Sequence, residues 1–257
     1  MGSHTFMSGH SKWSSIKHKK GAADKKRGQL FSKLSRAIIV AAREGGPDPA
    51  NNLALQNAVE KARSYSMPKD NIERAIARGS GADADAAAYE TVVYEGYGAG
   101  GVAILVEALT DNRNRTASDV RAAFAKHEGN LGTSGAVAWQ FERRGIVLVN
   151  ADGVDEDELT MAAAEGGAED VTLDGTTFQI TAAPEDLTTV REAVEAAGFI
   201  VESAELTMAP KTTVEVEDEP TAKKILRLMD SLEENDDVQE VYSNFDIPER
   251  VLETVAG

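Results

Sequence analysis

The order of helices and strands predicted between residues 145 and 206 constrains the fold of this chain more than any other feature. A β-branched run from Ile146 to Val149 is followed by a helical stretch with acids in its first turn, Asp155 to Glu165. The pair Asp174-Gly175 favours a hairpin, and a second helix and a last strand ending at Leu206 follow. The order β-α-β-β-α-β is that of a ferredoxin-like domain, a fold that hosts many functions and therefore identifies none.

The first part of the chain has helical spacing. Apolar residues recur at intervals of three and four in stretches that are separated by glycine and proline. The predicted helices run from Leu30 to Gly45, from Asn51 or Asn52 to Ser66, and from Pro68 to Gly79. We therefore predict a helical N-terminal domain over residues 7–81. Residues 1–6 precede a second methionine, and we interpret them as a tag.

Strand patterns lie on both sides of the ferredoxin-like segment. The predicted strands are Thr91 to Tyr94, Gly101 to Leu109, Val137 to Phe141, Lys211 to Val216 and Val238 to Tyr242, with helices from Ser118 to His127 and from Thr221 to Leu232. The glycine-rich run Glu95 to Gly101 reads as a turn, because a phosphate-binding loop needs a helix directly after it.

The tail is too small to form a stable sheet alone, so we expect it to complete the strands that precede the ferredoxin-like segment. The predicted fold class is α+β with three domains. These are the N-terminal helical domain with a basic arm (7–81), a discontinuous middle α+β domain (82–144 and 207–257), and the ferredoxin-like domain (145–206) inserted in the middle one.

Positive charge is concentrated near the N-terminus. Gly9 to Arg43 holds seven Lys and three Arg against a single acid, Asp24, which gives +9 within a chain of net charge −16. The remaining residues therefore carry −25. Such a separation indicates that a polyanion would meet the basic end first. We call Gly9 to Gly28 the basic arm, because it contains too few apolar residues to bury a face of its own.

These charges identify candidate contacts to a nucleic acid. Phosphate contacts of this kind are mostly independent of base sequence. The candidates near the N-terminus are Lys12, Trp13, Lys17, His18, Lys19, Lys20, Lys25, Lys26, Arg27, Lys33 and Arg36. Trp13 has two interpretations: it either attaches the basic arm to the body of the protein or stacks on a base.

A second candidate patch follows the predicted strand that ends at Leu109. It comprises Arg113, Asn114 and Arg115, in the run Thr110-Asp111-Asn112-Arg113-Asn114-Arg115-Thr116. Asp and Asn are typical of turns and helix caps, whereas paired arginines suit a clamp on phosphates. Both interpretations stay open at this point.

Residues for catalysis are scarce. The chain has no Cys, and outside the tag its only histidines are His10, His18 and His127. For His127, at a predicted helix end, we favour a structural role. There is no nucleophile-elbow, phosphate-loop or metalloprotease motif, so we predict no catalytic residue, no metal and no cofactor. No apolar run approaches the ~20 residues that span a bilayer, and we expect a cytoplasmic protein without a membrane partner.

Several separated motifs together resemble the YebC/PmpR family. They are Gly9-His10-Ser11-Lys12-Trp13, Ile16-Lys17-His18, Arg27-Gly28, Met67-Pro68-Lys69-Asp70-Asn71-Ile72-Glu73-Arg74-Ala75-Ile76, Tyr94-Glu95-Gly96-Tyr97-Gly98, the Thr110–Thr116 run, and Gly129-Asn130-Leu131-Gly132. The sequence departs from the family pattern at Glu128, where Gly is expected, and at Ala99, where Pro is common.

The resemblance implies three domains, with a ferredoxin-like domain inserted in the second. Bacterial members carry the label of probable DNA-binding transcriptional regulators, and a mitochondrial relative activates translation of a cytochrome oxidase subunit. Members are also linked to ribosomes stalled on proline-rich sequences. The resemblance implies neither an enzyme activity nor a cofactor.

The leading hypothesis is a non-enzymatic, nucleic-acid-binding regulator of gene expression that acts as a translation factor on the ribosome or its RNA. The first alternative is a sequence-specific DNA-binding transcriptional regulator, and a distant one is an enzyme acting on nucleic acid. A third is a scaffold whose acidic part binds basic proteins; ribosomal proteins would be such partners. We expect a monomer.

Overall fold

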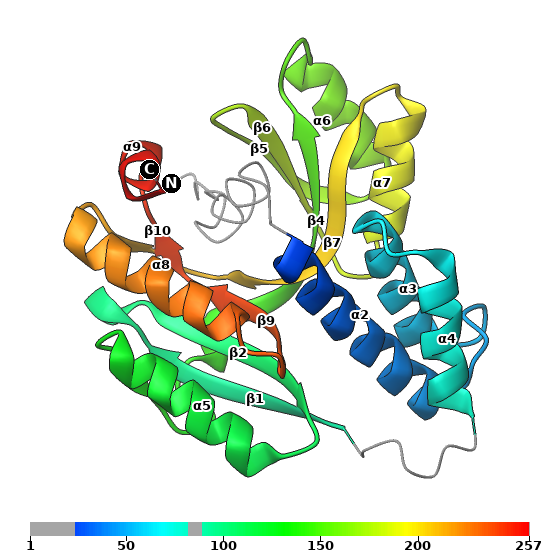
Figure 1. The fold of residues 1–257 in the computed structure, drawn as a ribbon. Helices are drawn as coiled ribbons and strands as arrows, with labels where there is room; N and C mark the ends of the chain where they lie inside the picture. Colours follow the sequence, from blue (N-terminus) through cyan, green and yellow to red (C-terminus); the bar gives the residue numbers. More distant parts are fainter. Residues whose placement is uncertain (1–23, 82–88, 257) are drawn as a thin grey trace. The chain divides into compact units, whose positions relative to one another are not determined.

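The computed structural model describes residues 24–81 and 89–256 (Figure 1). They fall into two compact units. One unit contains Trp139–Glu215 and Tyr242–Ile247. The other contains the helical N-terminal segment together with residues 89–138, 216–241 and 248–256. The fold is α+β, as predicted. The three-domain division stays a prediction.

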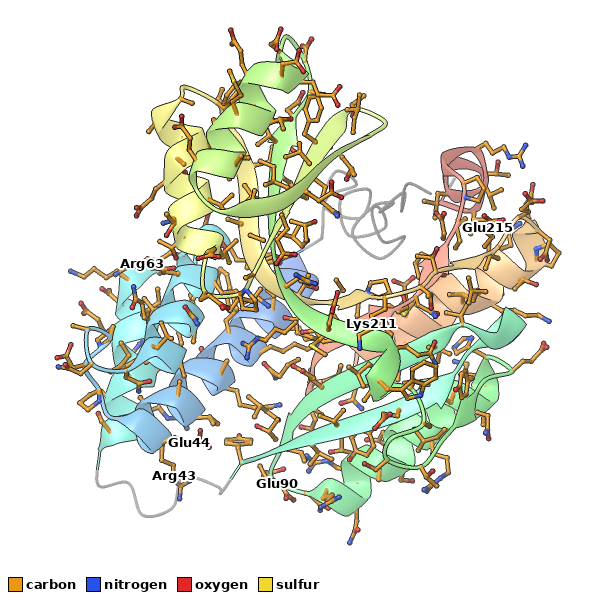
Figure 2. All side chains as sticks on the ribbon, turned by 180° about the vertical axis from the view of Figure 1, so that it is seen from behind. Arg43, Glu44, Arg63, Glu90, Lys211 and Glu215 are labelled. Carbon is orange, nitrogen blue, oxygen red and sulfur yellow. The ribbon has the colours of Figure 1, made fainter. Side chains whose placement is uncertain are left out.

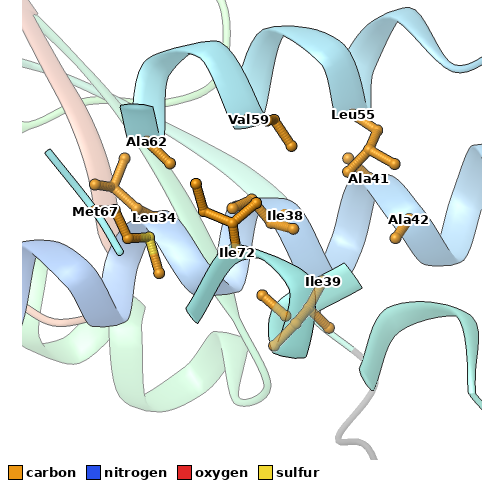
Figure 3. Packing of buried hydrophobic residues seen from close by; sticks show 11 residues of the cluster. Leu34, Ile38, Ile39, Ala41, Ala42, Leu55, Val59, Ala62, Met67 and Ile72 are labelled. Atoms are coloured by element: carbon orange, nitrogen blue, oxygen red, sulfur yellow. The ribbon is translucent and has the colours of Figure 1, made fainter. Parts of the chain in front are cut away.

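The three predicted N-terminal helices are present as α2 (Asp24–Gly45), α3 (Leu53–Ser64) and α4 (Lys69–Ser80). Asn52 caps α3: its side-chain oxygen accepts from Leu55 N at 3.1 Å, and its Nδ2 donates to Ala41 O at 2.7 Å. The buried faces of the helices pack into one core (Figure 3). Its members are Leu34, Ile38, Ile39, Ala41, Ala42, Leu55, Val59, Ala62, Met67, Ile72 and Ala75.

The second unit also contains a four-stranded sheet in the order β3-β1-β2-β9. Its strands are β1 (Glu90–Tyr97), β2 (Ala103–Thr110), β3 (Asn130–Leu131) and β9 (Val238–Ser243). Helix α5 (Arg113–Lys126) packs on β1 and β3 and against α8 (Glu219–Glu233). A Cβ on Gly96 would lie 2.6 Å from the Phe124 ring, so glycine is needed where α5 covers β1. A turn between β1 and β2 is present as predicted, with η1 (Ala99–Gly101) at its tip, but it is shorter than the predicted Glu95 to Gly101, because Glu95, Gly96 and Tyr97 pair with β2.

The other unit has the predicted ferredoxin-like topology. Its sheet order is β5-β6-β4-β7, with every neighbouring pair antiparallel. The elements are β4 (Phe141–Asn150), α6 (Glu156–Glu165), β5 (Ala168–Asp174), β6 (Thr177–Ala182), α7 (Leu187–Ala196) and β7 (Val201–Pro210). The hairpin differs in one detail: Asp174 pairs with Thr177, so the two loop residues are Gly175, with φ of 59°, and Thr176.

Two predictions about strands were wrong, and one helix was missed. Of the strand predicted over Val137 to Phe141, only Phe141 lies in a strand, at the start of β4. The residues before it form η2 (Ala138–Gln140), and the Glu95 carboxylate binds the backbone N–H groups of Val137 and Ala138. In the tail, only β9 joins the β1–β2 sheet. Strand β8 (Val214–Glu215) instead pairs in parallel with β10 (Phe245–Asp246). Helix α9 (Glu249–Ala256) was not predicted.

Candidate nucleic-acid interface

Most candidate contacts in the basic arm cannot be placed. Lys12, Trp13, Lys17, His18, Lys19 and Lys20 lie outside the described residues. For Lys25 and Lys26 the structure describes only the backbone, in the first turn of α2. Arg27 follows them and is exposed to solvent. These contacts therefore stay predictions.

Lys33 and Arg36 contact the chain segment that joins α8 to β9. The Lys33 ammonium donates to Glu233 O at 2.5 Å. Arg36 Nη1 donates to Asp236 O at 2.6 Å and to Leu109 O at 3.2 Å. Burial lowers the pKa of Lys33, and the neighbouring acids, Glu233 foremost, oppose that effect. Both cations thus make contacts within the protein that the sequence did not reveal.

The carboxylate of Asp237 joins the two candidate patches. Its Oδ1 accepts from Arg36 Nη1 at 3.2 Å and its Oδ2 from Arg115 Nη2 at 2.8 Å. The hydroxyls of Thr116 and Thr110 lie 2.7 Å and 3.3 Å from Oδ2. Burial favours the neutral form of Asp237, but the hydrogen bonds from Arg115 and Thr116 and the two positive charges outweigh it and lower its pKa. We call these five residues the Asp237 cluster.

The predicted helix was expected to begin only at Ser118, which would leave the second patch in a loop. The structure instead places Arg113, Asn114 and Arg115 in the first turn of α5. The helix begins there because Asn112 is its N-cap, whose side-chain oxygen accepts from Arg115 N at 3.1 Å. Capping therefore accounts for Asn112. The Arg115 guanidinium also binds Asp111 at 2.8 Å. Arg113 and Asn114 are the exposed side chains of this turn that have no role in the Asp237 cluster.

Further polar contacts hold the N-terminal helices against the same segment. Gln29 Nε2 donates to Glu234 O at 2.6 Å and to Asp236 Oδ1 at 2.8 Å. On α3, Lys61 forms an ion pair with Glu240 of β9. The cations that face α8 and β9 therefore hold the structure together.

Glu95 holds the loop that leads into β4. Its buried carboxylate accepts hydrogen bonds from the backbone N–H groups of Gly135, Val137 and Ala138, each at 2.7 Å. Its carbonyl oxygen accepts from Gly132 N, also at 2.7 Å. Burial tends to raise the pKa of Glu95, but the three backbone hydrogen bonds prevail and lower it.

Sequence reasoning missed both Asp237 and Glu95. Asp237 follows Asn235 and Asp236, so the run reads as an ordinary polar turn. Glu95 lies between Tyr94 and Gly96 and was counted as part of a turn. The only signal for Glu95 in the sequence is an acidic residue next to a strand pattern, and this signal does not identify the partner of the carboxylate.

Other chemistry has little support in the described residues. His127 follows α5, and burial, then the charges of Lys126 and Arg227, lower its pKa. Within residues 24–81 and 89–256, no group of three or more His, Asp or Glu side chains could hold a metal ion. None of the helices in those ranges has the length and apolar character needed to cross a membrane.

Comparisons of the sequence with family models and with known proteins agree on one family. Residues 11–82 match the model of the TACO1/YebC protein N-terminal domain, and residues 89–245 match that of the TACO1/YebC second and third domain. A protein of Rubrobacter xylanophilus named "Probable transcriptional regulatory protein" is 62% identical over 98% of this chain and 100% of its own length. One of Halothermothrix orenii with the same name is 54% identical over 97% and 99%.

A solved structure is also similar. It is the crystal structure of a conserved hypothetical protein from Aquifex aeolicus, with 51% sequence identity and a TM-score of 0.77. The match covers 88% of this chain and 93% of the other.

Proposed function

This chain belongs to the TACO1/YebC family, and we propose that it is a non-enzymatic, nucleic-acid-binding regulator of gene expression that acts on the ribosome or its RNA. The observation that carries the proposal is the charge separation. Gly9 to Arg43 has a net charge of +9, and the rest of the chain has −25. A protein with this distribution presents a strongly positive surface to polyanions at its N-terminal end.

The contacts made within the protein divide the candidate residues into two groups. Lys33, Arg36 and Arg115 hold α2, α5 and the start of β9 together. Among the described candidates, Arg27, Arg113 and Asn114 are exposed and lie outside that network. We assign phosphate contact to these three and to the other candidates of the basic arm. Two separate patches favour a large, shaped target such as a ribosome over a short duplex.

Replacing Lys19, Lys20, Lys25 and Lys26 by alanine is expected to weaken binding to ribosomal RNA and to flatten its salt dependence. Each phosphate contact contributes about 0.7 to the slope of log K against log salt on single strands and about 0.9 on duplex DNA. The slope is measured by fluorescence anisotropy at several salt concentrations.

The matched control replaces four exposed cations elsewhere, Lys69, Arg121, Arg227 and Arg250, which changes the net charge equally. We expect this control to retain most of the wild-type slope. Equal slopes for the two variants would remove the basic arm from the interface.

The names of the relatives support a second candidate function, a sequence-specific transcriptional regulator. That function requires direct or indirect readout of a duplex and therefore a preference among DNA sequences. Binding of promoter fragments that is at least tenfold tighter than binding of shuffled duplexes would favour it over the ribosome.

A further inference from the structure

An exposed tryptophan lies at the start of the unit that contains the ferredoxin-like sheet. Trp139 lies in η2, directly before β4, and 67% of its surface is accessible. Large aromatic side chains bury 150–250 Å² when they pack fully, whereas most of the surface of Trp139 stays accessible. Aromatic residues at such positions are typical of binding sites, because they offer a rigid flat surface at low entropic cost.

The backbone around Trp139 is fixed from one side by Lys211. The ammonium of Lys211 donates to Trp139 O at 3.1 Å, and its backbone N–H donates to Gln140 O at 2.8 Å. The side chain of Gln140 is in turn hydrogen-bonded by Asn244 Nδ2 at 3.2 Å. The indole is therefore displayed from a backbone that is already ordered, which reduces the cost of binding a partner.

The charge of this unit is unevenly distributed. Trp139–Glu215 contains 17 acids and only four cations, Arg143, Arg144, Arg191 and Lys211. Three of these four lie where β4 and β7 pair next to Trp139: Phe141 is opposite Pro210, and Arg143 is opposite Met208. Lys211 directly follows β7 (Figure 2). Arg144 is neutralised by Glu142 and Glu169, whereas Arg143 and Lys211 are exposed.

We propose that Trp139, together with Lys211 and Arg143, is a stacking site for an unpaired base of a single-stranded nucleic acid. The base would stack on the indole, and the two cations would contact the flanking phosphates. This inference deepens the proposed function and rests on it. A paired base in a duplex does not offer its face, so the site would select single-stranded regions of the target. The cations in an otherwise acidic unit favour a polyanion over an apolar or proline-rich peptide.

The experiment uses the fact that the chain has only two tryptophans, Trp13 and Trp139. In the full-length Trp13→Phe variant, indole fluorescence reports on Trp139 alone. We would titrate this protein with a twelve-nucleotide oligouridine, with a duplex of equal length, and with inorganic polyphosphate. The expected result is strong quenching by the oligouridine, and little quenching by the duplex or by polyphosphate, which carries charge without bases.

Variants of the full-length protein then measure the contribution of the ring. Trp139→Ala is expected to bind oligouridine roughly 5- to 150-fold more weakly, the range for loss of one base–aromatic stack. Trp139→Phe should recover part of this loss, and Lys211→Ala should weaken binding without abolishing the quenching. Ile200→Ala, which removes a residue of the same unit that is 80% exposed, should leave affinity unchanged.

The outcomes separate this inference from the function on which it rests. Tight oligonucleotide binding by anisotropy with unchanged Trp139 fluorescence would overturn the stacking site and leave the proposed function standing. Equal quenching by duplex or polyphosphate would also overturn it. A proline-rich peptide that quenches Trp139 while oligouridine does not would assign the site to another partner. If neither the wild type nor the Trp13→Phe variant binds any nucleic acid by anisotropy, both proposals fail.

Discussion

Replacing Glu95 by glutamine is expected to lower the free energy of unfolding by about 2–4 kcal/mol. The carboxylate accepts three backbone N–H groups at 2.7 Å in a buried position. Glutamine has the same size but only one acceptor oxygen, and its NH₂ group would face the backbone N–H donors that now bind the carboxylate. Urea unfolding measures the change.

Glu90→Gln is the matched control, because Glu90 lies on the same strand but is exposed. It should change stability by no more than about 0.5 kcal/mol. If both variants unfold at the same urea concentration, the three short hydrogen bonds do not stabilise the loop before β4.

The same carboxylate makes part of the stability depend on pH. The pKa of Glu95 is lower in the folded state than in the unfolded state. Its contribution to the free energy of unfolding is therefore fully present above the pKa that Glu95 has in the unfolded chain. It is lost as the pH falls through the folded pKa, because the unfolded state then binds the proton more readily. The stability difference between wild type and Glu95→Gln should therefore shrink in acid and stay constant between pH 6 and about pH 8.

Replacing Asp237 by asparagine is expected to destabilise the protein by about 2–4 kcal/mol, because it removes the negative charge that pairs with Arg36 and Arg115. The Asp237 side chain is 7% exposed and that of Arg36 is 17% exposed, so water can compensate only in part. Without this charge the contact between α2 and α5 should loosen, and hydrogen exchange should rise around Arg36 in the middle of α2 and at the start of α5. Chemical unfolding and hydrogen-exchange mass spectrometry measure the two effects.

Asp111→Asn provides the comparison for Asp237. Asp111 binds the same guanidinium of Arg115 from a more exposed position. Exposed ion pairs contribute little, so this variant should cost no more than about 1 kcal/mol. A larger loss for Asp111→Asn than for Asp237→Asn would show that the buried carboxylate is not the centre of the cluster.

Much of the fold could be predicted because local chemistry decides it. Asn52 caps α3, Pro68 precedes α4, and the β-α-β-β-α-β order gives the sheet order that was expected. The failures concern long-range partners. Val137 is apolar enough for a strand, but its N–H binds Glu95, a residue far away in the sequence. Strand β8 pairs with β10, and no local pattern indicates that choice.

The candidate site shows the same limit. Its charge pattern could be read from the sequence, because a cluster of Lys and Arg needs no structural context to be seen. The sequence could not show which of these cations face inward, since Lys33 and Arg36 differ from Arg27 only in what lies opposite them. Arg115 likewise resembles Arg113 in sequence, yet only Arg115 reaches Asp237.

Co-sedimentation with ribosomes on a sucrose gradient tests the central claim most directly. We would compare the untagged wild type, the variant with Lys19, Lys20, Lys25 and Lys26 replaced by alanine, and the charge-matched control, each at two salt concentrations. We expect the wild type and the control to travel with ribosomes at physiological salt and the basic-arm variant to stay at the top of the gradient. A wild-type protein that stays at the top while binding promoter fragments with sequence preference would contradict this claim.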